Sequence, residues 1–162
     1  MKKETRLGKL GKREKLLLGI VLLSFIEVIY FYFRAKPYNG VNILGDMPGY
    51  VMLGLMTFLI AYFLLLDKQN FHKKHILIGM AYVLLLFAPF MFERDIPNVK
   101  VDDAQAMIAR TEGGKVVKDR EYQNTIMNYD DREVYLIALE KKDAVYRYAF
   151  DPYTEQYYPF SN

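Results

Sequence analysis

Residues 16–33 read LLLGIVLLSFIEVIYFYF, an apolar run that Ser24 and Glu27 interrupt. Two similar runs follow: residues 50–66 read YVMLGLMTFLIAYFLLL, and residues 76–92 read ILIGMAYVLLLFAPFMF. Each run has 17 or 18 residues and is bounded by charged side chains. This length is at the short end of what crosses a hydrocarbon core of roughly 30 Å.

Backbone polar groups cannot stay unpaired in lipid, so apolar runs of this length must be helical if they span a membrane. The sequence therefore predicts a three-helix transmembrane region over 16–92, with helices at about 16–34, 49–66 and 75–92. The alternative is a globular protein with three buried core helices. The near absence of amphipathic periodicity in the three runs argues against it.

Charge divides the chain at the end of the third run. Residues 1–92 hold 12 Lys and Arg against 5 Asp and Glu, whereas residues 93–162 hold 10 against 14. A chain of 162 residues with three spans has room for one soluble domain of that size. The basic excess lies beside apolar runs, where membrane topology explains it better than nucleic-acid binding.

The chain has no cysteine, which excludes disulfides, cysteine-ligated zinc and thiol catalysis. The first apolar run is too long for the apolar core of a signal peptide, and no small-residue cleavage site follows it. We therefore expect it to be a retained anchor.

Lysine and arginine bias predicts the orientation of the spans. Residues 1–15 carry seven basic side chains, and the loop between the second and third runs adds three. The opposite side carries five, namely Arg34, Lys36, Arg94, Lys100 and Arg110. Ten against five predicts a cytoplasmic N-terminus over 1–15 and an extracytoplasmic domain over 93–162. The basic N-terminus could also bind anionic lipid headgroups, although setting the topology suffices to explain it.

Glu27 is the polar residue that a membrane span tolerates least. At 1.5 Å per residue it lies about 18 Å along the helix from Lys15 and about 10 Å from Arg34, within the hydrocarbon region. A carboxylate there must face protein, be paired or be protonated. Thr57 lies at similar depth and is a candidate hydrogen-bond partner, and Ser24 lies one turn away on the same face. Glu27 could join helices of this chain, contact a polar group of a partner membrane protein, or serve an ion pathway, which a lone carboxylate serves poorly.

Other features of the membrane region give weaker signals. Gly49, Gly54 and Ala61 allow close helix approach, either within one chain or between chains. His72 and His75 have a spacing that could place both on one helix face, but no third ligand adjoins them, so we expect no metal site.

The soluble domain begins with a helix and continues with strands. Asp102–Asp103 before an alanine-rich segment predict an N-cap with an acidic first turn, and Gly113–Gly114 predict the helix end. Strands are expected at 115–122, 133–140 and 144–150, with a short edge strand near 157–160. In the 133–140 strand, Val134, Leu136 and Ala138 should lie on one face and Tyr135, Ile137 and Leu139 on the other. Turns are expected at Asp130–Asp131 and at Asp143, which gives a small α+β domain with one helix on an antiparallel sheet.

Two segments of this domain resemble the PepSY family. Residues 101–117, VDDAQAMIARTEGGKVV, resemble its opening helix and strand, and residues 135–158, YLIALEKKDAVYRYAFDPYTEQYY, resemble its closing hairpin. The family usually has glycine where this chain has Glu155. The resemblance covers about sixty residues and none of the spans. It implies a bacterial, membrane-anchored, non-catalytic domain that binds and restrains or chaperones a partner protein.

The tyrosines of the domain are consistent with binding, since tyrosine is favoured at interfaces, although β-propensity also explains several of them. Tyr153, Tyr157 and Tyr158 are the candidates for partner contact. The sequence favours an accessory or regulatory protein whose outer domain binds a peptidase, a cell-wall enzyme or a membrane complex. The alternative is a small subunit of a transport or secretion complex in which the spans and Glu27 are functional. No nucleophile–base set or phosphate loop indicates an enzyme, no cofactor is expected, and the expected partners are membrane lipids and another protein.

Overall fold

The computed structural model describes residues 11–65, 71–117, 127–129, 132–142 and 144–160. The chain divides into two compact units. The first comprises Met1–Phe31 and Met47–Arg94, and the second comprises Tyr32–Asp46 and Asp95–Asn162.

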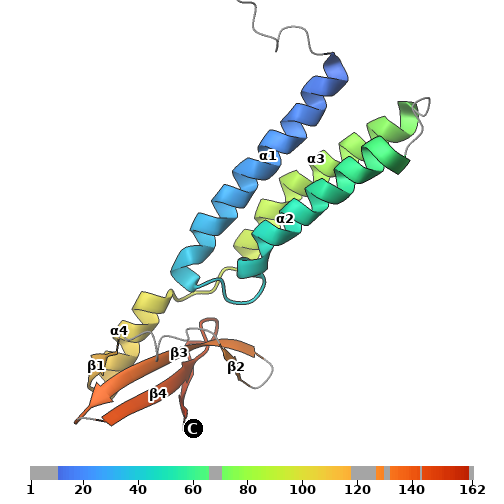
Figure 1. Cartoon of the computed structure of the whole chain (residues 1–162). Helices are drawn as coiled ribbons and strands as arrows, with labels where there is room; N and C mark the ends of the chain where they lie inside the picture. The colour runs from blue at the N-terminus through green and yellow to red at the C-terminus, as the bar shows by residue number, and fades with distance from the viewer. Residues whose placement is uncertain (1–10, 66–70, 118–126, 130–131, 143, 161–162) are drawn as a thin grey trace, which may run out of the picture. The chain divides into compact units, whose positions relative to one another are not determined.

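Three long helices carry the apolar runs: α1 (Lys12–Ala35), α2 (Ile43–Ile60) and α3 (Phe71–Arg94) (Figure 1). A π-helical turn, η3 (Ala61–Leu65), continues α2. The segments Lys12–Tyr38, Ile43–Leu64 and His72–Arg94 are each long and apolar enough to cross a membrane. The three predicted spans are therefore confirmed as candidate membrane-spanning helices. Hydropathy marks only the apolar part of a helix, whereas backbone hydrogen bonding continues into the charged flanks, so α1 and α3 are longer than predicted. α2 begins at Ile43, before the predicted start at residue 49, and ends at Ile60, where η3 continues it.

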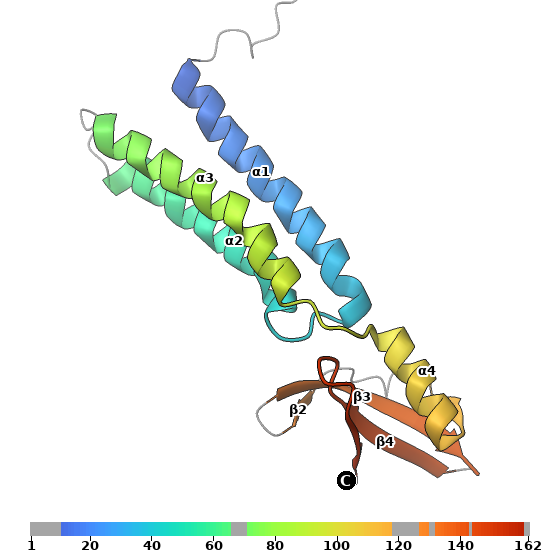
Figure 2. The ribbon, with the colours of Figure 1, turned by 180° about the vertical axis from the view of Figure 1, so that it is seen from behind.

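Side chains from all three helices form the core of the first unit. α2 and α3 lie side by side (Figure 2), and the buried core residues are Ile20, Leu55, Phe58, Tyr62 and Ile78. α1 contacts α3 near both of its ends. The Tyr82 hydroxyl donates to the Leu16 carbonyl at 2.9 Å, and the Phe31 and Phe92 rings lie 4.7 Å apart between centroids.

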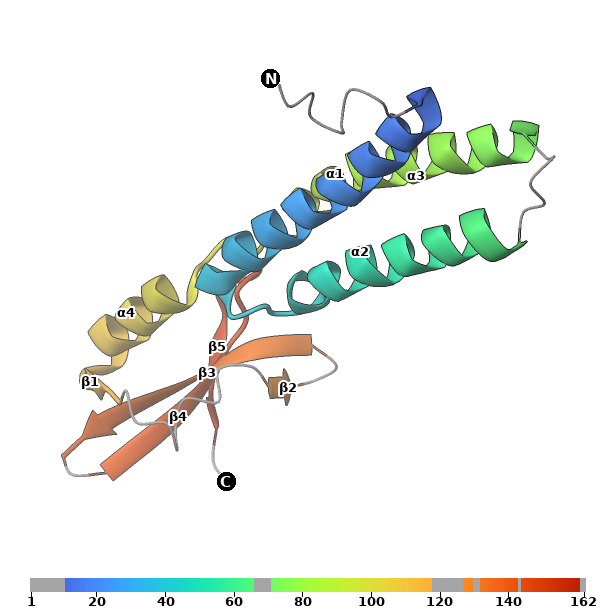
Figure 3. The same ribbon diagram turned by 45° about the horizontal axis from the view of Figure 1, so that its top comes forward.

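The second unit contains one helix and a five-stranded antiparallel sheet, as seen among the described residues (Figure 3). The helix is α4 (Val101–Glu112), and the strands are β1 (Lys115–Val116), β2 (Met127–Tyr129), β3 (Arg132–Lys141), β4 (Ala144–Phe150) and β5 (Tyr157–Phe160). The strand order is β1-β3-β4-β5, and β2 pairs with the beginning of β3. The predicted α+β class is confirmed.

The ends of α4 match the prediction in part. Asp102 and Asp103 lie in the first turn, where their charge is favourable near the helix N-terminus. The predicted N-cap role of this pair is wrong, because the N-cap is Lys100, without a side-chain cap hydrogen bond. Gly113 is the C-cap with φ 68°, and its N–H donates to the Ala109 carbonyl.

The two faces of β3 are both buried, but they are covered by different parts of the chain. Tyr135, Ile137 and Leu139 alternate along β3 with Val134 and Ala138, and all five are buried. The Tyr135 hydroxyl donates to the Val99 carbonyl at 3.1 Å, so its face of the sheet is the one that α4 and its leading segment cover. The predicted alternation of β3 is confirmed.

Three predicted strands lie wholly within the described residues, and a fourth lies there in part. The strands expected at 133–140 and 144–150 are β3 and β4, and the expected edge strand is β5. Of the strand expected at 115–122, Lys115–Val116 is seen as β1, while 118–122 lie outside the described residues. The predicted turns at Asp130–Asp131 and Asp143 also lie outside them. The sequence did not predict β2, which is only three residues long.

The loop between the first two helices belongs to the second unit, the one that contains the sheet and that we expect to be soluble. It contains the 3-10 turn η2 (Lys36–Tyr38), in which Tyr38 is buried. The Asn42 amide nitrogen Nδ2 donates to the Tyr153 hydroxyl at 2.9 Å, and the Asn42 backbone N–H donates to the Glu133 carboxylate. The soluble unit therefore includes this loop in addition to the predicted domain over 93–162.

Candidate functional site

The two polar residues that interrupt the apolar run of α1 are buried without complete hydrogen bonding. Ser24 is fully buried and Glu27 is 5% exposed. Neither Ser24 Oγ nor Glu27 Oε2 has a hydrogen-bond partner among the described residues. Their spacing of three residues places both on one face of α1. Thr57, the predicted partner of Glu27, instead donates to the Leu53 carbonyl of its own helix at 2.9 Å.

The three candidate tyrosines have different environments. The Tyr153 hydroxyl donates to the Asp95 carbonyl at 2.9 Å and accepts from Asn42, and burial raises the Tyr153 pKa. The Tyr157 hydroxyl donates to Glu112 Oε1 at 3.1 Å. These two side chains therefore join parts of the domain to one another. Tyr158 is 44% exposed and faces a cleft.

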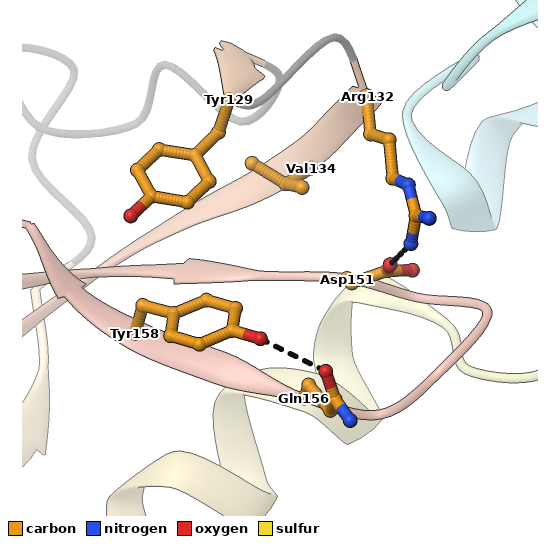
Figure 4. A pocket seen from close by; sticks show the side chains of 6 residues that line it. All are labelled: Tyr129, Arg132, Val134, Asp151, Gln156 and Tyr158. Atoms are coloured by element: carbon orange, nitrogen blue, oxygen red, sulfur yellow. Dashed lines mark hydrogen bonds and ion pairs between the residues drawn. The ribbon is translucent and has the colours of Figure 1, made fainter.

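That cleft lies on the face of the sheet opposite α4 and has a volume of about 750 Å³ (Figure 4). Tyr129 from β2 and Tyr158 from β5 stack along it, with ring centroids 5.9 Å apart and an interplanar angle of 20°. Val134 is on β3, which lies between β2 and β5 in the order of the strands. The other lining residues are Arg132, Asp151 and Gln156. We call this site the tyrosine cleft.

Two of the residues that line the tyrosine cleft, Arg132 and Asp151, form an ion pair. Arg132 Nη1 donates to Asp151 Oδ2 at 3.3 Å. The two side chains differ in exposure, since Arg132 is 68% exposed and Asp151 only 10%. Burial raises the pKa of Asp151, but the backbone N–H groups of Tyr153 and Thr154, with Arg132, outweigh it and hold the pKa below its ordinary value. Asp151 is therefore a fixed anion that orients the Arg132 guanidinium at the mouth of the cleft.

The turn that follows Asp151 forms despite the missing glycine. Asp151 Oδ1 accepts the N–H of Tyr153 at 2.9 Å, and the Glu155 N–H donates to the Asp151 carbonyl at 2.9 Å. Glu155 has φ 61°, the left-handed conformation that glycine adopts without strain. The position where the PepSY pattern carries glycine is thus a position where glycine would fit the backbone.

The two histidines of the chain lie in the first unit. His72 and His75 are both exposed on α3. Within the described part of the chain, no group of three or more histidine, cysteine or acidic side chains is placed to hold a metal ion.

Sequence reasoning found Tyr158 and missed the rest of the tyrosine cleft. Asp151 could have been found, because an aspartate before Pro152 in a turn commonly accepts backbone N–H groups. Tyr129 and Arg132 gave no comparable signal. They lie opposite each other on β2 and β3 and reach Tyr158 only through the pairing of β2, β3, β4 and β5.

The described residues thus define a candidate multi-pass membrane protein with a small α+β unit. Comparisons with family models, curated proteins and solved structures give no match for this chain. The resemblance to the PepSY family stays a prediction.

Proposed function

We propose that this chain is a membrane-anchored accessory or regulatory protein whose soluble domain binds a segment of a partner protein in the tyrosine cleft. The observation that carries the proposal is the exposed aromatic pair of Tyr129 and Tyr158 beside a partly free guanidinium. Tyrosine and arginine are enriched in the residues that dominate protein–protein binding energy. The role is one of binding rather than catalysis, with a peptidase, a cell-wall enzyme or a membrane complex as the class of partner.

The charge at the mouth of the cleft indicates what the partner segment carries. Asp151 holds one nitrogen of the Arg132 guanidinium and is itself almost completely buried. The remaining N–H groups of Arg132 can donate to an approaching carboxylate, a contact for which the planar guanidinium is well suited. A polypeptide segment with an acidic side chain next to an apolar or aromatic one would match both features.

The proposed location is a cell membrane, with residues 1–15 in the cytoplasm and the soluble unit outside. The excess of basic residues on the N-terminal side of the spans supports this orientation. The loop containing Asn42 and the domain containing Tyr153 bond at 2.9 Å, as expected if three crossings place both on one side of a membrane.

Photo-crosslinking in native membranes tests the binding role. The full chain would carry a photoreactive residue at position 158 or, as the matched control, at position 146. Tyr146 is also exposed, at 51%, but its β3 partner is Leu139, on the face opposite the cleft. We expect one protein to be crosslinked from position 158 and not from position 146.

A second variant tests whether that crosslink depends on the tyrosine cleft. Arg132→Gln keeps a hydrogen-bonding side chain opposite Asp151 but removes the charge, and should lower the yield from position 158 at least about fivefold, roughly 1 kcal/mol. Equal yields from positions 158 and 146, or a yield that Arg132→Gln leaves unchanged in a folded variant, would reject the cleft as the binding site.

The second candidate function is that of a small subunit in a membrane transport or secretion complex. The buried, unpartnered oxygens of Ser24 and Glu27 favour it, because such groups in a span commonly face a polar group of another protein segment.

A further inference from the structure

The three-helix unit contains a groove of about 480 Å³ that α1, α2 and α3 all line. On α2 and at the start of η3 the lining residues include Gly54, Thr57 and Ala61, whose spacing places them on one helix face. On α3 they include Ala81 and Ala88. Small side chains of this kind let a neighbouring helix backbone approach closely in a membrane.

The packing of this chain does not explain the small residue at the centre of the groove. A Cβ added at Gly54 would meet no atom within 4 Å, so no close approach within the chain requires glycine there. Gly19 is different, because a Cβ there would collide with the Tyr82 hydroxyl where α1 meets α3. The small stripe on α2 thus faces space that the chain itself leaves unfilled.

The α1 side of the groove is polar. Ser24 lines the groove, is fully buried, and its Oγ has no hydrogen-bond partner among the described residues. Glu27 does not itself line the groove but lies one turn beyond Ser24 on the same helix face, and its Oε2 is likewise unpartnered. Lipid tails offer no donor, so these two oxygens stay unsatisfied unless protein supplies one.

No lysine or arginine of this chain lies at the depth of these two oxygens. Between Lys15 and Arg34, in residues 37–67 and in residues 75–93, the sequence has no lysine or arginine. The Tyr82 hydroxyl is already bonded to the Leu16 carbonyl. A second copy of this chain would bring the same spans, which carry no cation at this depth.

We propose that the groove receives a transmembrane helix of a partner protein, and that a lysine or arginine on that helix pairs with Glu27 and Ser24. The inference rests on the second candidate function and is independent of the tyrosine cleft. An acyl chain would fill the apolar walls but would leave both oxygens unpaired. A cationic helix fills the groove and supplies the missing donors.

Model peptides test this pairing with the full chain in phosphatidylcholine vesicles. The chain has no cysteine, so Glu14→Cys provides a single site for a fluorescent donor at the start of α1. The acceptor-labelled probes are two leucine–alanine peptides of about 20 residues, long enough to span the bilayer. One has a central lysine, and the other has leucine in its place. We expect the lysine peptide to bind about tenfold more tightly, which corresponds to about 1.4 kcal/mol.

Three variants locate the binding. Glu27→Leu should remove the preference for the lysine peptide. Gly54→Leu should weaken binding of that peptide about tenfold, because the added side chain occupies the groove without a clash inside the chain. Gly79→Leu is the matched control. A Cβ at Gly79 also meets no atom within 4 Å, but Gly79 does not line the groove, so binding should not change.

The outcomes separate this inference from the function on which it rests. Equal affinities for the two peptides on the unmodified chain would overturn the cation pairing. If Gly54→Leu then weakened the binding of both peptides, the groove would remain a site for a helix. Unchanged binding to the Gly54→Leu variant would overturn the groove itself. A lipid that copurifies with the chain and is lost in Gly54→Leu, with no peptide preference, would assign the groove to an acyl chain and overturn the proposal.

Discussion

Gly40 and Gly45 show how closely the loop after α1 is packed. Gly40 has φ 68°, a conformation that few side chains tolerate, and the Gly45 N–H donates to its carbonyl at 3.0 Å. A Cβ added at Gly45 would lie 2.6 Å from that carbonyl oxygen, which belongs to the backbone and cannot turn aside. The loop that places Asn42 beside Tyr153 therefore requires a residue without a Cβ at position 45.

Gly45→Ala should therefore destabilise the soluble unit by about 1–3 kcal/mol, the usual cost of overpacking. Gly49→Ala is the matched control on the same helix, because a Cβ there meets no atom within 4 Å. The control should be neutral or more stable by up to about 1 kcal/mol, since alanine is the better helix former. Thermal unfolding followed by tyrosine near-ultraviolet circular dichroism measures both, and equal midpoints would contradict the steric account.

At the same scale, the sequence predicted which polar residues enter the membrane but not what they contact. Glu27 and Ser24 were expected on one buried face of α1, and both are buried. The Thr57 hydroxyl was predicted to bond Glu27 only because the two residues lie at a similar depth in the membrane. Depth ignores helix rotation, and a threonine hydroxyl in a helix readily bonds the carbonyl four residues earlier, as it does here with Leu53.

At the scale of elements, one carboxylate joins the end of α4 to three strands. Glu112 Oε2 accepts from Lys141 Nζ of β3 at 2.9 Å and from the Tyr148 hydroxyl of β4 at 3.2 Å. Glu112 Oε1 accepts from the Tyr157 hydroxyl of β5 at 3.1 Å. The hydrogen bond from Lys141 is the main reason that the Glu112 pKa lies below its ordinary value, followed by that from Tyr157. The Lys141 pKa is raised by its bonds to Tyr148 and Glu112.

These shifts predict the pH dependence of stability. Because the Glu112 pKa is lowered on folding, its contribution is complete above the ordinary glutamate pKa of about 4.3 and is lost as pH falls through the lowered value. The Lys141 contribution is present below its ordinary pKa and is lost only as pH rises through the raised value. Glu112→Gln should therefore lower the unfolding midpoint at pH 7 and reduce the loss of stability on acidification.

Unfolding midpoints of the two proteins at pH 7 and in the acid range measure this effect. Glu140→Gln is the control, because Glu140 is an exposed glutamate on the neighbouring part of β3. If Glu112→Gln and Glu140→Gln shifted the acid limb equally, Glu112 would have no special role in joining α4 to the sheet.

The elements themselves were predictable where the pattern was long. The apolar run 134–139 between Glu133 and Glu140 located β3, and Gly113–Gly114 located the end of α4. The three-residue β2 and the joining of four elements at Glu112 were not predictable. Both depend on residues that are distant in sequence, which only the antiparallel register of the strands brings together.

At the scale of the whole molecule, the soluble unit is built from two separated stretches of chain. Tyr32–Asp46 lies between the first two spans, and Asp95–Asn162 follows the third. If all three helices cross, an odd number of crossings separates the N-terminus from each stretch, and both stretches lie on the side opposite the N-terminus. The hydrogen bond between Asn42 and Tyr153 needs both stretches on one side of the membrane, and it would be impossible if α2 alone or α3 alone failed to cross.

Single cysteines test which side this is, since the chain has none of its own. Glu14→Cys and Asp102→Cys each replace an exposed acidic residue in the first turn of a helix, α1 and α4 respectively, and leave the lysine and arginine bias intact. In intact cells a membrane-impermeant maleimide should label Asp102→Cys and not Glu14→Cys, whereas permeabilised cells should give both. The reverse pattern would place the tyrosine cleft in the cytoplasm and require a cytoplasmic partner. Labelling of both sites in intact cells would mean that the three helices do not all cross, and the bond between Asn42 and Tyr153 would then require that α1 is the helix that does not.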